Sequence, residues 1–129
     1  MIKKTKKWDI RCPKKLKEMF PKEERRGYYY KVNNNTALKI VKILSKEYGI
    51  KPPKIAKIER NTGANAMYYY EAKTILLYSR NHMKSVFHEF YHHLDNMTNR
   101  KYDSDDRSGG DTSLAWQFAD LMWEKFTEK

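Results

Sequence analysis

The chain has 129 residues, a formal net charge of +11 from 27 Lys or Arg and 16 Asp or Glu, and one cysteine. This length suits a single domain with a modest core, and one cysteine excludes a disulfide framework or a Cys-rich zinc finger. No apolar run could span a membrane, and the basic N-terminus lacks the apolar centre of a secretory signal. We therefore expect a soluble, cytoplasmic protein without membrane contact.

Positive charge is concentrated in the first two thirds of the chain. Residues 1–31 carry twelve Lys or Arg and four acids, whereas residues 82–129 carry six and nine. A basic surface can attract nucleic acid or an acidic protein, although lysine-rich surfaces also serve solubility alone. We therefore keep nucleic acid as an alternative partner, bound through the basic N-terminal region.

Residues 1–35 are expected to form this basic N-terminal extension, packed on a domain that spans residues 36–129. Within the extension, apolar residues at helical spacing predict a short helix over residues 13–20, which Pro21 ends. Three consecutive tyrosines predict an extended, packed segment over residues 28–32.

A helix, a strand and a hairpin are predicted next. Apolar residues at helical spacing predict a helix that begins at the cap residue Thr36, ends at Gly49 and backs the sheet. A strand is predicted over residues 54–60. Two β-rich runs, residues 66–70 and 74–79, are close enough together to predict a hairpin. These segments predict an α+β domain with a small sheet of about three or four strands.

Residues 83–97 predict an amphipathic helix that carries the candidate chemistry. Its apolar residues recur at three- and four-residue steps and form one stripe. His88 and His92 are four residues apart, so they project from the same face and can hold two corners of a tetrahedral zinc site. Glu89 lies beside the first histidine, where it can take a proton from a water on the metal. We expect the helix to bury one flank and to present these three residues on the other.

The run His88-Glu89-Phe90-Tyr91-His92 has the HExxH pattern, and residues 66–126 resemble the zincin metallopeptidases. The chain is most similar to compact gluzincins such as the minigluzincins, and also to the ImmA-like and SprT-like peptidases. The resemblance is strong over the motif helix. It implies a zinc cofactor, a peptide or unfolded protein as substrate, and Glu89 as the general base. It also implies that the strand before the motif helix, over residues 75–78, runs along the cleft and pairs with extended substrate; the alternative is that this strand is only part of the core.

A third zinc ligand is expected after the motif helix, because a catalytic zinc usually has three protein ligands. Gluzincins use a Glu there, but this chain has none between His92 and Glu124. We predict Asp111 as the third ligand, because it opens a final helix over residues 112–126 and shares the stripe expected to face the core. The alternatives are an N-cap role for Asp111, Glu124 as the ligand despite its polar face, or an acid in the polar loop over residues 98–110.

Three other residues each have two interpretations. Asp95, three positions after His92, either orients a ligand imidazole or is a surface acid. His93 either contacts substrate or is simply a partly exposed side chain. Cys12 is either a small buried residue, which we favour, or a plug for the metal of the kind found in some zincin precursors.

The leading hypothesis is therefore a zinc-dependent metallopeptidase that cuts extended or unfolded segments. Its relatives by resemblance, the minigluzincins, can be held latent by their own C-terminal segment. The first alternative is a basic, nucleic-acid-associated protein with a zincin-like fold, as the SprT-like resemblance implies. The second is a non-catalytic scaffold in which the histidine pair is structural. Metal content separates the scaffold from the other two, and salt-dependent DNA binding identifies the nucleic-acid-associated protein. The oligomeric state stays open.

Overall fold

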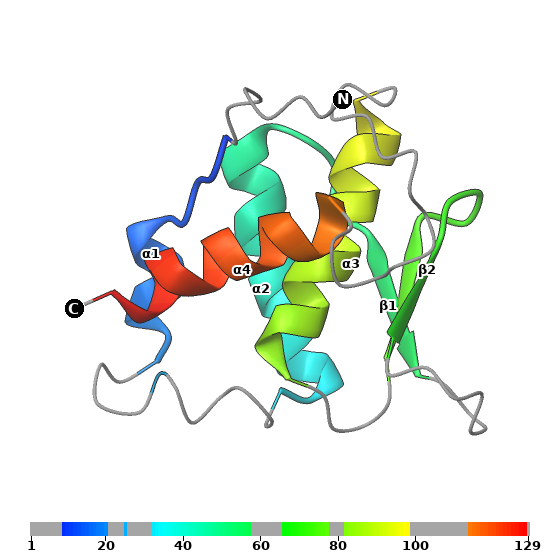
Figure 1. The fold of residues 1–129 in the computed structure, drawn as a ribbon. Helices are drawn as coiled ribbons and strands as arrows, with labels where there is room; N and C mark the ends of the chain where they lie inside the picture. The colour runs from blue at the N-terminus through cyan, green and yellow to red at the C-terminus, as the bar shows by residue number, and fades with distance from the viewer. Residues whose placement is uncertain are drawn as a thin grey trace.

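Four helices and a three-stranded sheet make up the part of the chain that the structure, a computed structural model, describes (Figure 1). The described residues are 9–20, 25, 32–57, 66–77, 82–98 and 114–128. In chain order the elements are α1 (Lys14–Glu18), α2 (Asn34–Tyr48), β1 (Lys54–Lys57), β2 (Ala66–Tyr69), β3 (Thr74–Leu77), α3 (Met83–Met97) and α4 (Leu114–Thr127). The predicted α+β class is confirmed. None of these helices has the length and apolar character needed to cross a membrane.

The sheet has the strand order β1-β3-β2, with β1 parallel and β2 antiparallel to β3. The hairpin of β2 and β3 is confirmed, with Tyr68 opposite Ile75 and Tyr69 opposite Thr74. The predicted role of the strand before α3 is wrong for residues 74–77, because β3 has neighbours on both sides and no edge left for substrate. Among the described strands, β2 is the edge that lies beside α3.

Helix α2 begins two residues earlier than predicted and has a different cap. Asn33 is extended, and its side-chain oxygen accepts the backbone N–H of Thr36 at 2.9 Å. The expectation that Thr36 is the cap is therefore wrong, since its own N–H is the group being capped. At the other end Gly49 has a φ of 72°, a left-handed conformation that suits glycine. The predicted end at Gly49 is confirmed.

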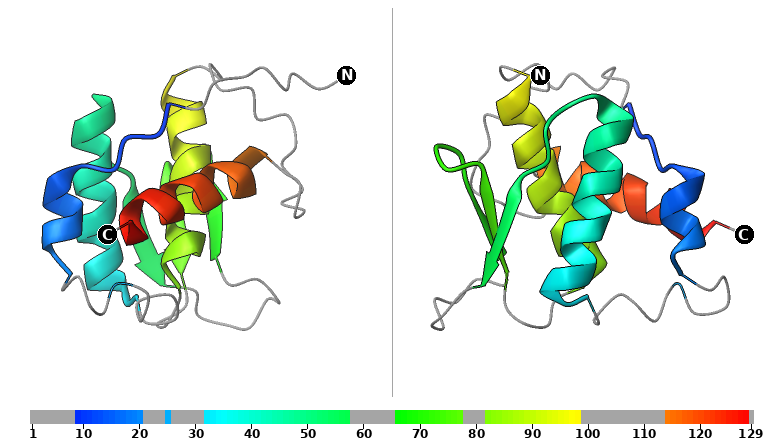
Figure 2. Two further views of the ribbon diagram at one scale, coloured as in Figure 1. Left: turned by 60° about the vertical axis from the view of Figure 1, so that its left-hand side comes forward. Right: turned by 180° about the vertical axis from the view of Figure 1, so that it is seen from behind.

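Helix α3 lies at the centre of the molecule, and its bounds are those that its periodicity predicts. It packs against α2, α4 and strand β2, and α4 crosses it on one side while the sheet lies on another (Figure 2). Twelve of its fifteen residues are buried. The expectation that α3 buries only one flank is therefore wrong, because the candidate ligand face is covered as well.

The first and last helices close the core at the opposite end from the hairpin. Leu16 of α1 is buried, as is Phe20 after it, and the ring of Phe20 lies 5.4 Å from that of Phe126 in α4. Cys12 packs partly buried against this core. Val32 is also buried, whereas the rest of the segment predicted over 28–32 lies outside the described residues.

Candidate metal centre

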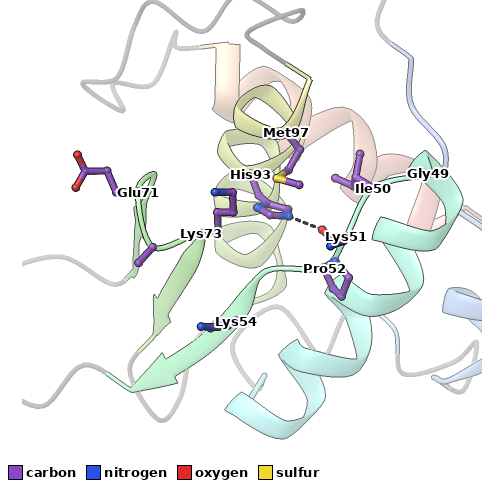
Figure 3. A pocket seen from close by; sticks show the side chains of 10 residues that line it. Gly49, Ile50, Lys51, Pro52, Lys54, Glu71, Lys73, His93 and Met97 are labelled. Atoms are coloured by element: carbon purple, nitrogen blue, oxygen red, sulfur yellow. Dashed lines mark hydrogen bonds between the residues drawn. The ribbon is translucent and has the colours of Figure 1, made fainter.

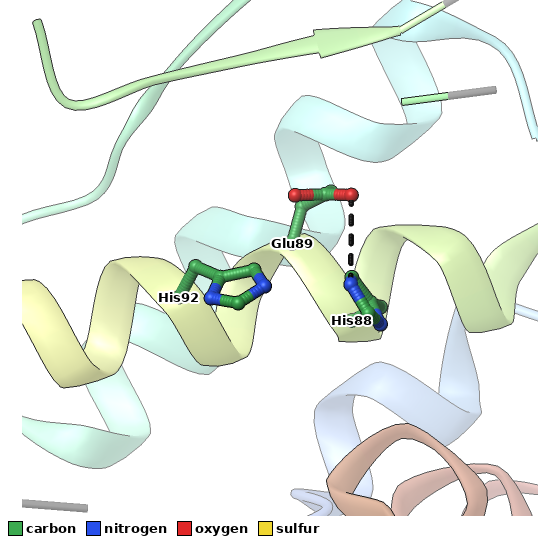
Figure 4. Close-up of side chains that lie close together, drawn as sticks. All are labelled: His88, Glu89 and His92. Atoms are coloured by element: carbon green, nitrogen blue, oxygen red, sulfur yellow. Dashed lines mark ion pairs between the residues drawn. The ribbon is translucent and has the colours of Figure 1, made fainter. Parts of the chain in front are cut away.

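Helix α3 brings His88, Glu89 and His92 together in one cluster, here called the candidate metal centre (Figure 4). Each residue offers a ligand atom, and these atoms all lie within 4.8 Å of one another. The two imidazole rings are 5.0 Å apart, as expected for side chains one helical turn apart. No other group of three or more His, Cys, Asp or Glu side chains meets this description among the described residues.

All three residues are almost fully buried, with exposed fractions of 6%, 6% and 7% for His88, Glu89 and His92. Burial lowers the pKa of His88 to about 3, with a further contribution from the charge of His92. Burial also raises the pKa of Glu89 to about 8. The 4.0 Å contact between His88 Nε2 and Glu89 Oε2 therefore joins two neutral groups at pH 7 rather than an ion pair.

These protonation states suit a metal. A neutral imidazole can donate its lone pair without first losing a proton, so protons do not compete for His88 near neutral pH. The buried Nδ1 of His88 has no hydrogen-bond partner among the described residues. Leaving a buried polar atom unpaired costs roughly 1–3 kcal/mol, but the nitrogen of His88 that faces the cluster is Nε2, 4.0 Å from Glu89 Oε2. Two imidazoles and a carboxylate are also the donor types that zinc takes in proteins.

His92 is oriented by a tyrosine that sequence reasoning placed only as a strand residue. The hydroxyl of Tyr70, just after β2, is 3.0 Å from His92 Nδ1. This contact engages Nδ1 and directs Nε2 toward any metal, the arrangement that fixes an imidazole ligand in metalloproteins. Tyr68 and Tyr70 are two residues apart, so period-two alternation is the signal that assigns both to the face covering α3.

His93 belongs to a separate network that ties α3 to the sheet. Its Nε2 is 2.7 Å from the carbonyl oxygen of Lys51, which can only accept, so Nε2 carries the proton. Its Nδ1 is then an acceptor for the hydroxyl of Tyr68 at 2.6 Å, and Asn96 donates to that hydroxyl at 3.0 Å. His93 is fully buried. The interpretation as a partly exposed side chain is therefore wrong, and the contact with substrate stays a prediction.

Helix α4 supplies an aromatic ring to the candidate metal centre. The ring of Trp116 lies 4.3 Å from that of His88, a packing contact that limits how the imidazole can turn. Sequence reasoning missed Trp116. It precedes Ala119 and Trp123 by three and seven residues, and this spacing, which includes two buried side chains, is the signal that puts it near the core face.

The third ligand is not found among the described residues. Asp111, the predicted ligand, lies outside them, as do the loop acids over 98–110 that we kept as alternatives. Glu124 is exposed, lies eight residues beyond Trp116 on α4, and is not part of the cluster. Eight helical residues span about 12 Å, so Glu124 is poorly placed. Asp111 precedes Trp116 by only five residues and stays the better prediction.

Two other sequence candidates are now placed. Asp95 is fully buried, so the interpretation as a surface acid is wrong; the orienting role stays a prediction. Cys12 is not part of the His88, Glu89 and His92 cluster. Burial raises the pKa of its thiol to about 11, despite the opposing charges of Lys17 and Arg25. Cys12 is thus only partly buried, rather than fully buried as we favoured, and its raised pKa makes the thiol unreactive near neutral pH.

Comparison with protein-family models, with curated proteins and with solved structures finds no match. The zincin resemblance therefore rests on the motif and its immediate context. The structure adds three local features at the candidate metal centre: a buried histidine pair, an adjacent buried carboxyl and a tyrosine that orients one of the imidazoles.

Proposed function

We propose that this protein is a zinc-dependent metallopeptidase that uses His88 and His92 as metal ligands. The observation that carries the proposal is the buried cluster on α3, with the ligand atoms of His88, Glu89 and His92 within 4.8 Å of one another. A buried carboxyl beside a buried pair of imidazoles is costly for stability, and a bound cation would offset that cost. Asp111 is the proposed third ligand.

Glu89 is the proposed general base. Zinc, when bound, supplies positive charge that acidifies water and polarises a substrate carbonyl. The Glu89 carboxylate accepts the proton of the attacking water and passes it to the leaving amine as the C–N bond breaks. Its burial keeps bulk water away from this transfer, because the side chain is only 6% exposed. Tyr70 and Trp116 keep the imidazoles of His92 and His88 in place through their contacts with those rings.

Strand β2 is the proposed place for substrate. It is an edge strand among the described residues, it lies against α3, and Tyr70, which follows it, reaches His92. An extended peptide can add to such an edge through main-chain hydrogen bonds, independent of its side chains. This mode suits unfolded segments as substrates. The cytoplasm suits a protein whose one cysteine is a free thiol.

Metal analysis of the purified protein, combined with three variants, tests the proposal. Wild type should carry close to one zinc per chain, and both His88→Ala and His92→Ala should lose most of it. Glu89→Gln should keep zinc but should not hydrolyse an unfolded protein. The glutamine side chain has the same size as glutamate but no carboxylate to accept the proton. Equal zinc in wild type and both histidine variants would remove the metal site. Zinc binding without hydrolysis by wild type, or by a form trimmed at either end, would favour the nucleic-acid-associated alternative, whereas a protein without zinc would favour the scaffold.

A further inference from the structure

A cavity of about 800 Å³ lies between helix α3, the hairpin turn and the segment that leads into β1 (Figure 3). Its walls are the segment over residues 49–54 that leads into β1, the hairpin turn over 71–73, and His93 and Met97 of α3. None of the three residues of the candidate metal centre lines it. The cavity is therefore a separate feature, and a ligand could bind there whether or not the protein holds zinc.

Three lysines, Lys51, Lys54 and Lys73, line this cavity, here called the lysine cavity. All three are exposed, and none forms an ion pair with a described residue. The one acid among the lining residues is Glu71, whose carboxylate points away from the cavity in Figure 3. Among the described residues, positive charge is thus gathered around the cavity without a counter-charge inside it, which favours an anionic ligand.

The main chains that carry the lysines are fixed to one another. His93 Nε2 donates to the carbonyl of Lys51 at 2.7 Å, and the N–H of Lys54 donates to the carbonyl of Lys73 at 3.0 Å. Lys73 has a φ of 51°, a left-handed conformation that lysine seldom adopts. Such backbone strain persists only where the surrounding structure imposes it. The cavity is therefore preorganised around its three charges.

Between the lysines the lining is apolar. Ile50, Pro52, Ala72 and Met97 contribute carbon atoms, and His93 presents a ring whose nitrogens are already engaged. The described part of the lining contains no Arg, Phe, Tyr or Trp, so it lacks the bidentate donors and stacking rings that nucleic-acid sites use. We propose that the lysine cavity binds an acidic peptide segment that also carries apolar side chains, with carboxylates at the lysines and aliphatic groups between them.

Fluorescence anisotropy with a labelled ten-residue peptide of alternating Glu and Leu tests this proposal on the full chain. The double variant Lys51→Gln/Lys73→Gln should bind it about tenfold or more weakly, because an exposed charge pair contributes up to about fivefold. The matched control is Lys39→Gln/Lys57→Gln, which removes the same charge from exposed positions outside the cavity. It should lose less than about twofold at 0.1 M salt, where distant charges are screened.

Two further probes separate the cavity from general charge attraction. A peptide with Ser in place of every Leu should bind more weakly to wild type, because it cannot fill the apolar lining. A labelled single-stranded DNA of the same charge should bind less tightly than the Glu-Leu peptide and should not distinguish the two double variants. Circular dichroism confirms that both variants fold. Equal losses from both double variants, no binding by wild type, or tighter binding of the DNA would overturn the proposal.

Discussion

Tyr70 and His92 are joined by a hydrogen bond of 3.0 Å between Oη and Nδ1, which links the end of β2 to the candidate metal centre on α3. With a metal on Nε2, the imidazole must carry its proton on Nδ1 and donate it to the tyrosine oxygen. The hydrogen bond fits that tautomer, because the hydroxyl can accept as well as donate, and it holds the ring in one orientation. Its consequences can be measured without any assay of hydrolysis.

Tyr70→Phe should lower the zinc affinity about tenfold or more, the range typical of lost partners of imidazole ligands. Competition with a chromophoric chelator measures this affinity. Tyr69→Phe is the matched control, because Tyr69 is the preceding residue, at the end of β2, and has 51% of its surface exposed. This variant should bind zinc like wild type. Equal affinities for the two variants would show that Tyr70 does not orient His92.

Zinc binding at pH 7 should release a proton from Glu89. Burial raises the pKa of this carboxyl to about 8, so it is mostly protonated in the metal-free protein, and the charge of zinc should lower that pKa. Calorimetry in buffers of different ionisation enthalpy counts the protons. Wild type should release up to one more than Glu89→Gln at pH 7, and the difference should shrink as the pH rises through 8. The same count for both proteins at pH 7 would contradict the raised pKa.

Asp111→Ala should weaken zinc binding far more than Glu124→Ala. Glu124 is exposed and two helical turns beyond the residue of α4 that contacts His88, so its loss should leave the affinity unchanged. Loss of a third protein ligand should cost about tenfold or more, since it removes one of the bonds that a catalytic zinc needs. A larger effect of Glu124→Ala would reverse the assignment, and no effect of either would point to an acid in residues 98–110, another histidine or a site completed by solvent.

Cys12 should react slowly with thiol reagents in the folded protein. The thiolate is the reactive form, and raising its pKa from 9.0 to about 11 lowers the thiolate fraction at pH 8 about a hundredfold. The rate with a disulfide reagent, compared between folded and denatured protein, measures this. The same shift predicts a stability that is complete below pH 9 and declines as the pH rises toward 11, because the unfolded chain loses this proton first. Fast modification at pH 8 in the native protein would contradict it.

His93→Ala should destabilise the fold by about 2 kcal/mol, because it leaves the Tyr68 hydroxyl and the Lys51 carbonyl without their partner. Chemical denaturation measures the change. Lys84→Ala is a useful comparison on the same helix: its ion pair with Asp120 is partly exposed and should contribute less than about 1 kcal/mol. If His93→Ala leaves the free energy of unfolding unchanged, this network does not hold α3 to the sheet.

The features that the sequence predicted correctly are those that depend on interactions between residues close together in the chain. The bounds of α3 follow from apolar residues at helical spacing, and the pairing of His88 with His92 follows from the pitch of one helix. The hairpin follows from two β-rich runs separated by a short turn, and the end of α2 follows from a glycine that adopts a positive φ. Each depends on residues close together in the chain.

Long-range packing decided the rest. β3 is the central strand because β1, about twenty residues earlier in the chain, pairs with it in parallel. No local sequence pattern predicts this long-range pairing. Trp116 reaches His88 because α4 folds back across α3, and Tyr70 reaches His92 because the hairpin packs against the same helix. The sequence alone determines that the two histidines lie one helical turn apart. The burial that makes His88 neutral and Glu89 reluctant to ionise comes from elements that surround α3, since desolvation is a property of the whole packed structure.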